Sequence, residues 1–178
     1  PVFDREFGAV TAGSSAHITD GAAWVLLASE ASVKDHDLNV LGRLVDTEWA
    51  GLDPRQMGLG PLHASVPMLR RRRLALNKID YWEINEAFAG QVLACLEAFK
   101  DVDYCRNELG LRSAMGELDP ERLNVDGGAV ALGHPVGTSG ARIVLHLLKV
   151  LEQKQARRGV AAICIGGGQG GAMLLERV

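Results

Sequence analysis

Apolar residues fall in short blocks separated by polar and glycine-rich stretches, and most of these blocks have the length of a β-strand. The strand-length blocks lie at residues 22–28, 40–49, 79–84, 160–165 and 172–176. The first block, Ala22–Ala28, is a continuous apolar run, which is typical of a buried strand. Residues 3–21 and 51–61 are rich in glycine and other loop-forming residues, so we expect irregular structure there.

Three other blocks carry apolar residues at helical spacing. They lie at residues 66–76, at residues 85–99 with Asn85 as the N-cap, and along a stripe at residues 143–151. Strands that alternate with helices and close on a hairpin predict an α/β fold, in which a mixed β-sheet is layered with helices. No linker divides the chain, so we expect residues 1–178 to form one domain.

Composition narrows the range of functions. Apolar residues make up 47% of the 178 residues, enough for a hydrophobic core. A net charge of −3 argues against binding to nucleic acids or membrane surfaces, and no apolar run has transmembrane length. Three scattered cysteines predict no metal site and a reducing compartment: the cytoplasm, or a mitochondrion or peroxisome in a eukaryote. A chain that begins with proline is expected to be processed or a fragment.

The most informative stretch is a glycine-rich turn at residues 124–142. Pro135 restricts the preceding residue, His134, to an extended backbone, and Thr138 or Ser139 is placed to cap the following helix. An imidazole held rigidly beside a helix N-terminus is well placed for acid–base chemistry. The alternative is a packed turn whose histidine forms only local hydrogen bonds.

Asn85, His134 and Cys164 each lie at the end of a predicted strand or in a turn between strands. Functional groups of an α/β sheet gather at strand ends. An amide, an imidazole and a thiol suit acyl transfer, because the imidazole can accept a thiol proton, the amide can orient a water or an oxyanion, and the thiol can act as a base. Taken singly, Asn85 could be a helix cap, Cys164 a buried strand cysteine, and Phe88 a packing residue.

Two further patterns have simpler interpretations. Arg70–Arg73 is interpreted as the solvated face of a helix, with binding of a ligand phosphate as the alternative. The glycines at residues 166–171 match G-x-G-x-x-G. Because neither a helix nor an acidic residue follows at the required spacing, no dinucleotide site is predicted.

Three motifs, in register, resemble the C-terminal signatures of thiolases, which transfer acyl groups between coenzyme A thioesters. They are Asn85-Glu86-Ala87-Phe88-Ala89, the stretch from Asn124 through Gly133-His134-Pro135 to Arg142, and Cys164-Ile165-Gly166-Gly167-Gly168. Residues 10–13 and 20–23 are similar to the segment that opens the C-terminal thiolase domain. The resemblance implies a C-terminal thiolase domain whose N-terminal counterpart, with the nucleophilic cysteine, lies outside these residues.

The resemblance also implies roles for individual residues. His134 would activate the nucleophilic cysteine and, with a water held by Asn85, would bind a thioester oxygen. Cys164 would exchange the α-carbon proton of an acyl-CoA in the Claisen step. The backbone amide of Gly166 would contribute to a second oxyanion hole, and Phe88 would line the acyl pocket.

Two segments depart from the thiolase pattern. Ser14-Ser15-Ala16-His17 stands where the family usually has Asn-Ala-Ser-Gly, in the loop that touches the pantetheine arm of CoA. Ser14, Ser15 and Ala16 are therefore the predicted substrate contacts on that side. Residues 100–121 are longer than the common pattern and are predicted to be a polar insertion.

We therefore expect the C-terminal domain of an acyltransferase of fatty acid metabolism or β-oxidation. It would act on acyl-CoA and CoA, by cleaving 3-ketoacyl-CoA or by condensing two acyl-CoAs, without a further cofactor. The alternative is a catalytically silent thiolase-like module for binding or assembly. Neither Cys95 nor Cys105 has the surroundings of a nucleophile, so the isolated chain is expected to be inactive. A homo-oligomer is expected to form through exposed apolar surface.

Overall fold

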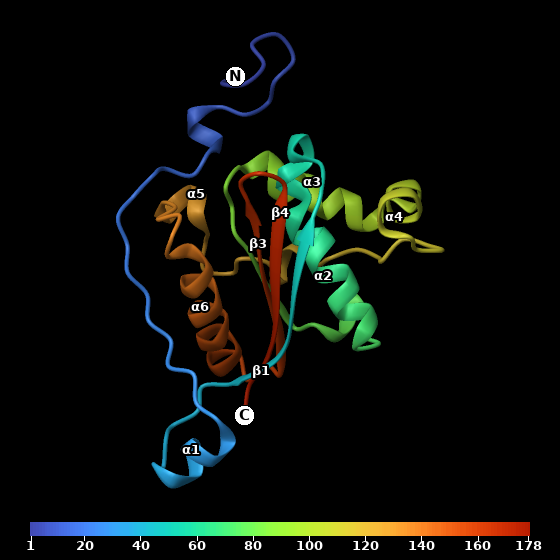
Figure 1. Cartoon of the computed structure of the whole chain (residues 1–178). Helices are drawn as coiled ribbons and strands as arrows, with labels where there is room; N and C mark the ends of the chain where they lie inside the picture. The colour runs from blue at the N-terminus through green and yellow to red at the C-terminus, as the bar shows by residue number, and fades with distance from the viewer.

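A four-stranded mixed sheet lies between layers of helices in the computed structural model, which describes residues 1–178 (Figure 1). The strands are β1 (Arg43–Gly51), β2 (Tyr81–Ile84), β3 (Arg158–Ile165) and β4 (Gln169–Glu176), in the order β1-β4-β3-β2. β4 is antiparallel to both β1 and β3, whereas β2 is parallel to β3. The predicted α/β class with a mixed sheet is therefore confirmed.

Helices cover both faces of this sheet. The α-helices are α1 (Glu30–Asp35), α2 (Gly60–Arg71), α3 (Ala89–Lys100), α4 (Val102–Leu109), α5 (Ala129–Leu132) and α6 (Ser139–Gln153). Short 3₁₀ turns form at η1 (Ala12–Ser14), η2 (Pro54–Leu59), η3 (Leu76–Lys78) and η4 (Pro120–Arg122). α2 and α3 lie on one side of the sheet and α6 on the other (Figure 1). None of the helices is both long and apolar enough to cross a bilayer.

Each face of the sheet buries its own hydrophobic cluster. The larger cluster includes Leu62 and Leu69 of α2, Phe99 of α3, and Trp82 of β2. The smaller cluster lies under α6, where Leu147 and its apolar neighbours pack on β3 and β4. Alternate residues of a strand point to opposite faces. Since Trp82 and Ile84 enter the larger cluster, Glu83 and Asn85 face α6.

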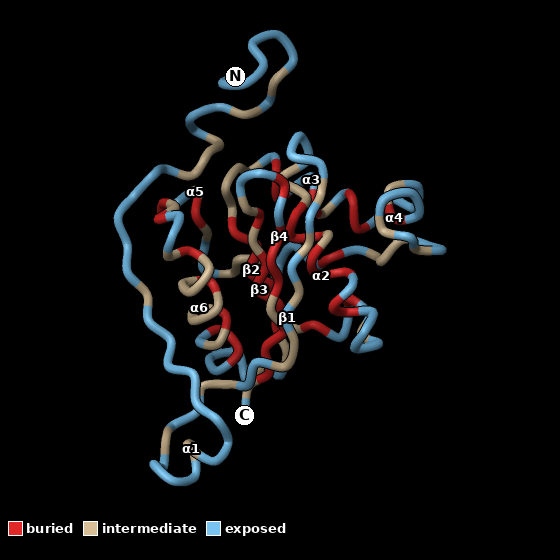
Figure 2. Tube along the Cα trace, in the orientation of Figure 1, coloured by how far each residue is buried: buried red, intermediate tan, exposed pale blue.

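The strand predicted at residues 22–28 is wrong. The segment is irregular, Trp24 and Leu26 are 87% and 84% exposed, and its backbone forms no hydrogen bonds with the rest of the chain. An apolar run forms a strand only beside another strand that satisfies its backbone groups, and none lies within reach. Residues 1–37 as a whole contain no buried residue and run along the outside of the molecule (Figure 2).

Two helices begin elsewhere than predicted. α2 covers residues 60–71 instead of 66–76, because the predicted loop at 51–61 is largely helical or 3₁₀. Asn85 is not a helix cap, since α3 begins at Ala89 after Phe88. Asn85 instead continues the line of β2, and its backbone nitrogen donates to the backbone carbonyl of Ala162, 2.9 Å away.

Residues 101–123 are more than a polar insertion. They contain α4 and η4, and they bury Cys105 and Leu118 at 0% and 4% exposure. Tyr104, Leu109 and other apolar residues of this segment pack against the larger hydrophobic cluster. The prediction overlooked that widely spaced apolar residues in a polar segment can still contribute to a core.

Candidate functional site

The candidate site lies where two parallel strands end at the same edge of the sheet. Asn85 directly follows β2, and Cys164 is the penultimate residue of β3. The 2.9 Å hydrogen bond from Asn85 to Ala162 places these two strand ends side by side. Asn85 and Cys164 therefore lie at the same edge of the sheet, as the position of each at a strand end predicts.

His134 lies in a turn whose backbone is held from several directions. Gly133 has φ of 89°, and a side chain at that position would collide with Thr19, so only glycine fits without strain. The amide nitrogen of His134 donates to the carbonyl of His17 at 2.7 Å, and Arg142 donates to the carbonyl of Gly133 at 2.9 Å. The imidazole therefore projects from a fixed backbone.

Ser139, the first residue of α6, orients the imidazole. Its hydroxyl lies 2.7 Å from Nδ1 of His134 and also donates to the carbonyl of Pro135 at 3.2 Å. Because the hydroxyl proton goes to Pro135, the hydroxyl oxygen accepts from an Nδ1–H of His134. The second ring nitrogen, Nε2, then carries a lone pair and is free to act as a base.

The side-chain amide of Asn85 lies next to that lone pair. Its Nδ2 is 3.4 Å from Nε2 of His134. Asn85 is only 2% exposed, and its Oδ1 has no hydrogen-bond partner. A buried carbonyl oxygen without a partner is costly and is usually satisfied by a water or a ligand. The Asn85–His134 pair thus combines a base with a polar group that is ready to accept a hydrogen bond.

Burial sets the protonation of the titratable groups at this edge. It lowers the pKa of His134, and the nearby positive charge of Arg142 lowers it further. Burial raises the pKa of the Cys164 thiol to about 11. At neutral pH the edge therefore presents a neutral imidazole and a protonated thiol. The Cys164 thiol forms no hydrogen bond with Asn85 or His134, so the structure brings the three residues to one edge but joins only two of them.

The predicted substrate contacts at residues 14–16 lie beside the segment that follows Asn85. Ser15 forms an antiparallel bridge with Phe88, and the amide nitrogen of Ala16 donates to the carbonyl of Ala87 at 3.0 Å. Ser14 is the last residue of the 3₁₀ turn before them. The side chains of Ser14 and Thr11 each accept a hydrogen bond from the other residue's backbone nitrogen. This segment therefore lies beside residues 87 and 88, in the connection between Asn85 and α3.

Gly166 opens the turn between β3 and β4. The next two glycines, Gly167 and Gly168, have φ of 87° and 84°, which non-glycine residues rarely adopt. A side chain at Gly168 would collide with the backbone carbonyl of Leu52. The backbone nitrogen of Leu52 donates to the carbonyl of Gly168 at 2.9 Å. The tight turn requires glycine at 167 and 168, whereas Gly166 has open space around it.

Sequence reasoning missed Glu86, which ties the two motif loops together. Its carboxylate accepts from Nδ2 of Asn124 at 2.9 Å and from the amide nitrogen of Val130 at 3.1 Å. Asn124 in turn holds both backbone groups of Ile84, at 2.9 Å each. Glu86 and Asn124 were visible inside the motifs, but their spacing of 38 residues hid the contact.

The remaining cysteines and the arginine run do not join the site. Cys95 and Cys105 are both 0% exposed, and their thiols donate to backbone carbonyls of Gly58 and Ala98. Burial raises the pKa of Cys95 to about 12, so its reactive thiolate is suppressed. The run Arg70–Arg73 is exposed as expected, but α2 ends at Arg71, so only part of the run belongs to a helix face. Arg71 and Arg72 form ion pairs with acidic residues of β1.

The fold and the Asn85–His134 pair define a class of protein, an α/β domain whose polar site lies at the carboxyl ends of its strands. The family described as "Thiolase, C-terminal domain" matches residues 38–177. The chain is 44% identical over 178 residues to the 3-ketoacyl-CoA thiolase of Citrobacter koseri, and 46% identical over 169 residues to the beta-ketoadipyl-CoA thiolase of Pseudomonas aeruginosa. All of this chain is covered in the first case and 95% in the second.

Solved structures give the same result. The acetyl-CoA acetyltransferase of Bacillus anthracis superposes with a TM-score of 0.81 at 39% identity, over 96% of this chain and 39% of its own. Human mitochondrial 3-ketoacyl-CoA thiolase in complex with CoA superposes with a TM-score of 0.80 at 38% identity. The match covers 100% of this chain and 41% of the human chain. The chain therefore belongs to the thiolase family and is its C-terminal domain. It spans 42% and 38% of the length of the two bacterial relatives.

Proposed function

We propose that this domain supplies the acid–base half of a thiolase active site, which transfers acyl groups between coenzyme A thioesters. The observation that carries the proposal is the contact between the lone pair of His134 Nε2 and the buried amide of Asn85, 3.4 Å apart. The names of the related proteins, 3-ketoacyl-CoA thiolase and acetyl-CoA acetyltransferase, support this reaction class.

In the proposed reaction, His134 accepts the proton of a nucleophilic thiol and then donates from Nε2 to the oxygen of the thioester. The free Oδ1 of Asn85 holds a water that donates a second hydrogen bond to that oxygen. A low pKa favours the neutral imidazole that this cycle starts from, and burial of His134 provides it. Ser139 keeps the imidazole in the required tautomer.

Cys164 has the properties of the proton donor that carbon–carbon cleavage needs. When a 3-ketoacyl chain is cleaved, the bond electrons remain on the departing acetyl-CoA as an enolate, which must take up a proton. Burial raises the pKa of Cys164 to about 11, so its thiol keeps that proton at neutral pH until the enolate accepts it. In the condensation direction the same thiolate would remove the proton.

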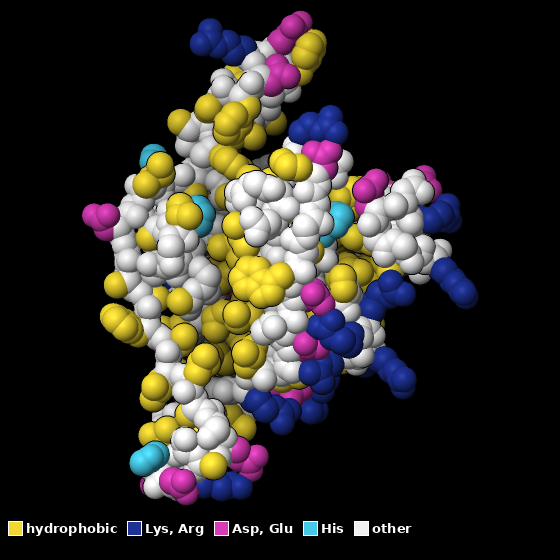
Figure 3. All heavy atoms as spheres, viewed as in Figure 1, with side chains coloured by type: hydrophobic (Ala, Val, Ile, Leu, Met, Phe, Trp, Pro, Cys, Tyr) yellow, Lys and Arg dark blue, Asp and Glu magenta, His cyan; other side chains and the backbone are white.

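The nucleophile and the rest of the pocket are proposed to come from an N-terminal thiolase domain. Neither Cys95 nor Cys105 faces His134, so this chain offers no second thiol. An apolar surface is available for such a partner. Hydrophobic side chains gather over the strip between α6 and β1 (Figure 3), where Trp49 is 64% exposed. We further propose a homo-oligomer that works in the cytoplasm, where its three free cysteines stay reduced.

The test is thiolysis of acetoacetyl-CoA by CoA, and the reverse condensation of acetyl-CoA, with a full-length thiolase that carries this chain as its C-terminal part. We expect turnover in both assays, and loss of turnover when Asn85 is replaced by alanine. A folded full-length protein without turnover would favour the alternative, a silent module for binding or assembly.

A further inference from the structure

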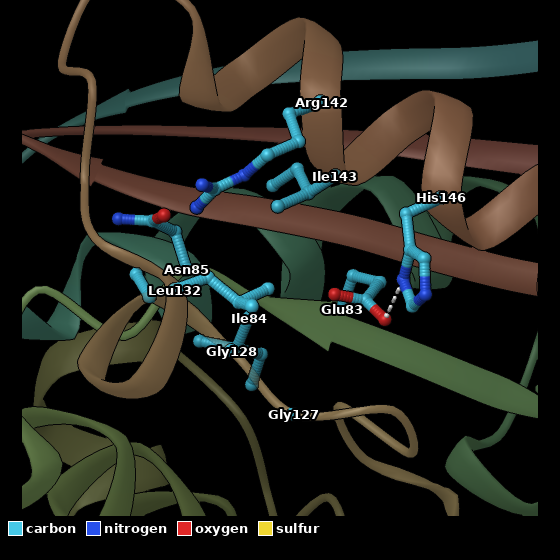
Figure 4. A pocket seen from close by; sticks show the side chains of 10 residues that line it. Glu83, Ile84, Asn85, Gly127, Gly128, Leu132, Arg142, Ile143 and His146 are labelled. Atoms are coloured by element: carbon cyan, nitrogen blue, oxygen red, sulfur yellow. Dashed lines mark hydrogen bonds and ion pairs between the residues drawn. The ribbon is translucent and has the colours of Figure 1, made fainter. Parts of the chain in front are cut away.

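An acid–histidine–acid cluster, buried at Glu83 and exposed at Asp126, lies beside the Asn85–His134 pair, on the face of the sheet covered by α6. Glu83 of β2 is only 4% exposed, and its carboxylate lies 2.8 Å from Nδ1 of His146 on α6 (Figure 4). The other ring nitrogen, Nε2, lies 3.1 Å from the carboxylate of Asp126, in the loop before α5. A buried carboxylate requires a hydrogen-bond partner, and His146 is the only side chain that forms a hydrogen bond with the carboxylate of Glu83.

Glu83 and Asn85, along the line of β2, are spaced like His146 and Arg142 on α6. Glu83 and Asn85 are two residues apart on the strand, a rise of about 6.6 Å, and they face the helix. His146 and Arg142 are four residues apart on the helix, a rise of about 6 Å. The four side chains line one cavity of about 120 Å³, with Glu83 opposite His146 and Asn85 toward Arg142 (Figure 4).

Because of this arrangement, a shift of α6 along β2 would change the distance between Asn85 and His134. The first residue of α6, Ser139, holds Nδ1 of His134, and Arg142 holds the carbonyl of Gly133. His134 therefore moves with α6, whereas Asn85 moves with β2. The hydrogen bond between His146 and Glu83 is the one side-chain hydrogen bond that joins α6 directly to β2.

We propose that Glu83, His146 and Asp126 form a positioning cluster that fixes the register of α6 against β2, and thereby sets the contact between Asn85 and His134. The proposal rests on the proposed function of that pair.

The number of protons makes this cluster sensitive to pH. Both ring nitrogens of His146 face carboxylate oxygens, but a neutral imidazole has only one N–H. Both hydrogen bonds can exist together only while the cluster holds one additional proton, and the buried carboxyl of Glu83 is the site for it. When that proton leaves, a nitrogen lone pair faces a carboxylate oxygen and one bond breaks. The cluster is therefore closed at lower pH and loosened at higher pH.

The surroundings of Glu83 favour retention of that proton near neutrality. Burial raises the pKa of Glu83 to about 7, the charge and hydrogen bond of His146 oppose this, and the negative charges of Glu86 and Asp126 add to it. Arg142 on α6 is the other charged residue that lines the cavity.

Three variants of the full-length enzyme test the proposal through the pH profile of kcat. Glu83→Gln is neutral at every pH and can donate to Nδ1 while Nε2–H donates to Asp126, so it mimics the closed cluster. We expect the ratio of its kcat to that of the wild type to rise with pH above about 7, by about tenfold. His146→Leu removes both bonds and should lower kcat about 10- to 100-fold with little change in KM. Asp126→Ala, at the exposed end, should lower kcat less and leave the fold intact.

The matched control is Glu152→Gln, an exposed carboxylate on the same helix that pairs with Lys149 at 3.0 Å. It should follow the wild-type profile. The proposal is overturned if the Glu83→Gln ratio is constant with pH, or if His146→Leu and Asp126→Ala keep wild-type kcat. A wild-type enzyme without turnover would contradict the proposed function instead. In that case the cluster is tested by NMR of ¹⁵N-histidine-labelled protein. The ring resonances of His134 should shift in His146→Leu and not in Glu152→Gln. If they do not shift in His146→Leu, the proposed positioning role is wrong.

Discussion

Replacing Glu83 with glutamine should remove a defined contribution to the pH dependence of folding stability. The carboxyl group of Glu83 has an ordinary pKa of 4.5, and burial raises it to about 7 in the folded protein. The folded state holds the proton more tightly than the unfolded state. The contribution of this bound proton to the free energy of unfolding is therefore fully present below pH 4.5 and is lost as the pH rises through 7. The difference between these two pKa values corresponds to about 3 kcal/mol.

The measurement compares the free energy of unfolding of wild type and Glu83→Gln by urea denaturation at about pH 4 and about pH 8. Glutamine has no proton to lose, so the variant should gain about 3 kcal/mol relative to wild type between these pH values. Glu152→Gln, whose carboxylate is exposed, should show no such gain. If the difference between wild type and Glu83→Gln is the same at both pH values, Glu83 does not hold its proton and the reasoning is wrong.

Three further predictions concern the proposed reaction. His134→Ala in a full-length enzyme should lose at least about 100-fold in turnover, because it removes the general base; near-normal turnover would exclude that role. Cys164→Ala should still form a radiolabelled acyl-enzyme while thiolysis and condensation fall; a folded variant that forms no acyl-enzyme would place Cys164 in an earlier step. The 178 residues alone should sediment as a dimer or larger species and release no CoA from acetyl-CoA; turnover that disappears on mutating Cys95 or Cys105 would contradict this.

The sequence allowed the sheet and one pair of site residues to be predicted because both depend on local patterns. The strands predicted at 160–165 and 172–176 lie within β3 and β4, and the strand predicted at 79–84 contains β2. Asn85 and His134 were expected to lie near each other because each lies at a strand end or in a turn between strands, and the structure places Nδ2 of Asn85 3.4 Å from Nε2 of His134. The roles of Asn85, His134, Cys164 and Gly166 remain predictions.

Contacts between distant elements could not be predicted in the same way. The hydrogen bond between Glu83 and His146 joins residues 63 positions apart, and its register depends on how α6 lies across β2. No periodicity of a single segment contains that information. Similarly, Asn85 is a residue type that favours helix N-caps, but three non-helical residues separate it from the start of α3 at Ala89. In both cases tertiary packing decided between alternatives that local propensity left equal.

Three features of the molecule are left without a partner in this chain. The apolar segment 22–28 has no strand beside it, and its neighbour Gly21 accepts a hydrogen bond from Thr138 at the start of α6. Trp49 lies on the α6 side of β1, because the adjacent Ala50 packs into the opposite cluster. Nε2 of His134 faces no thiol. We infer that a single partner surface covers all three features. It would pair with the segment 22–28, bury Trp49 and bring a thiol to His134, which matches a chain spanning about 40% of its relatives.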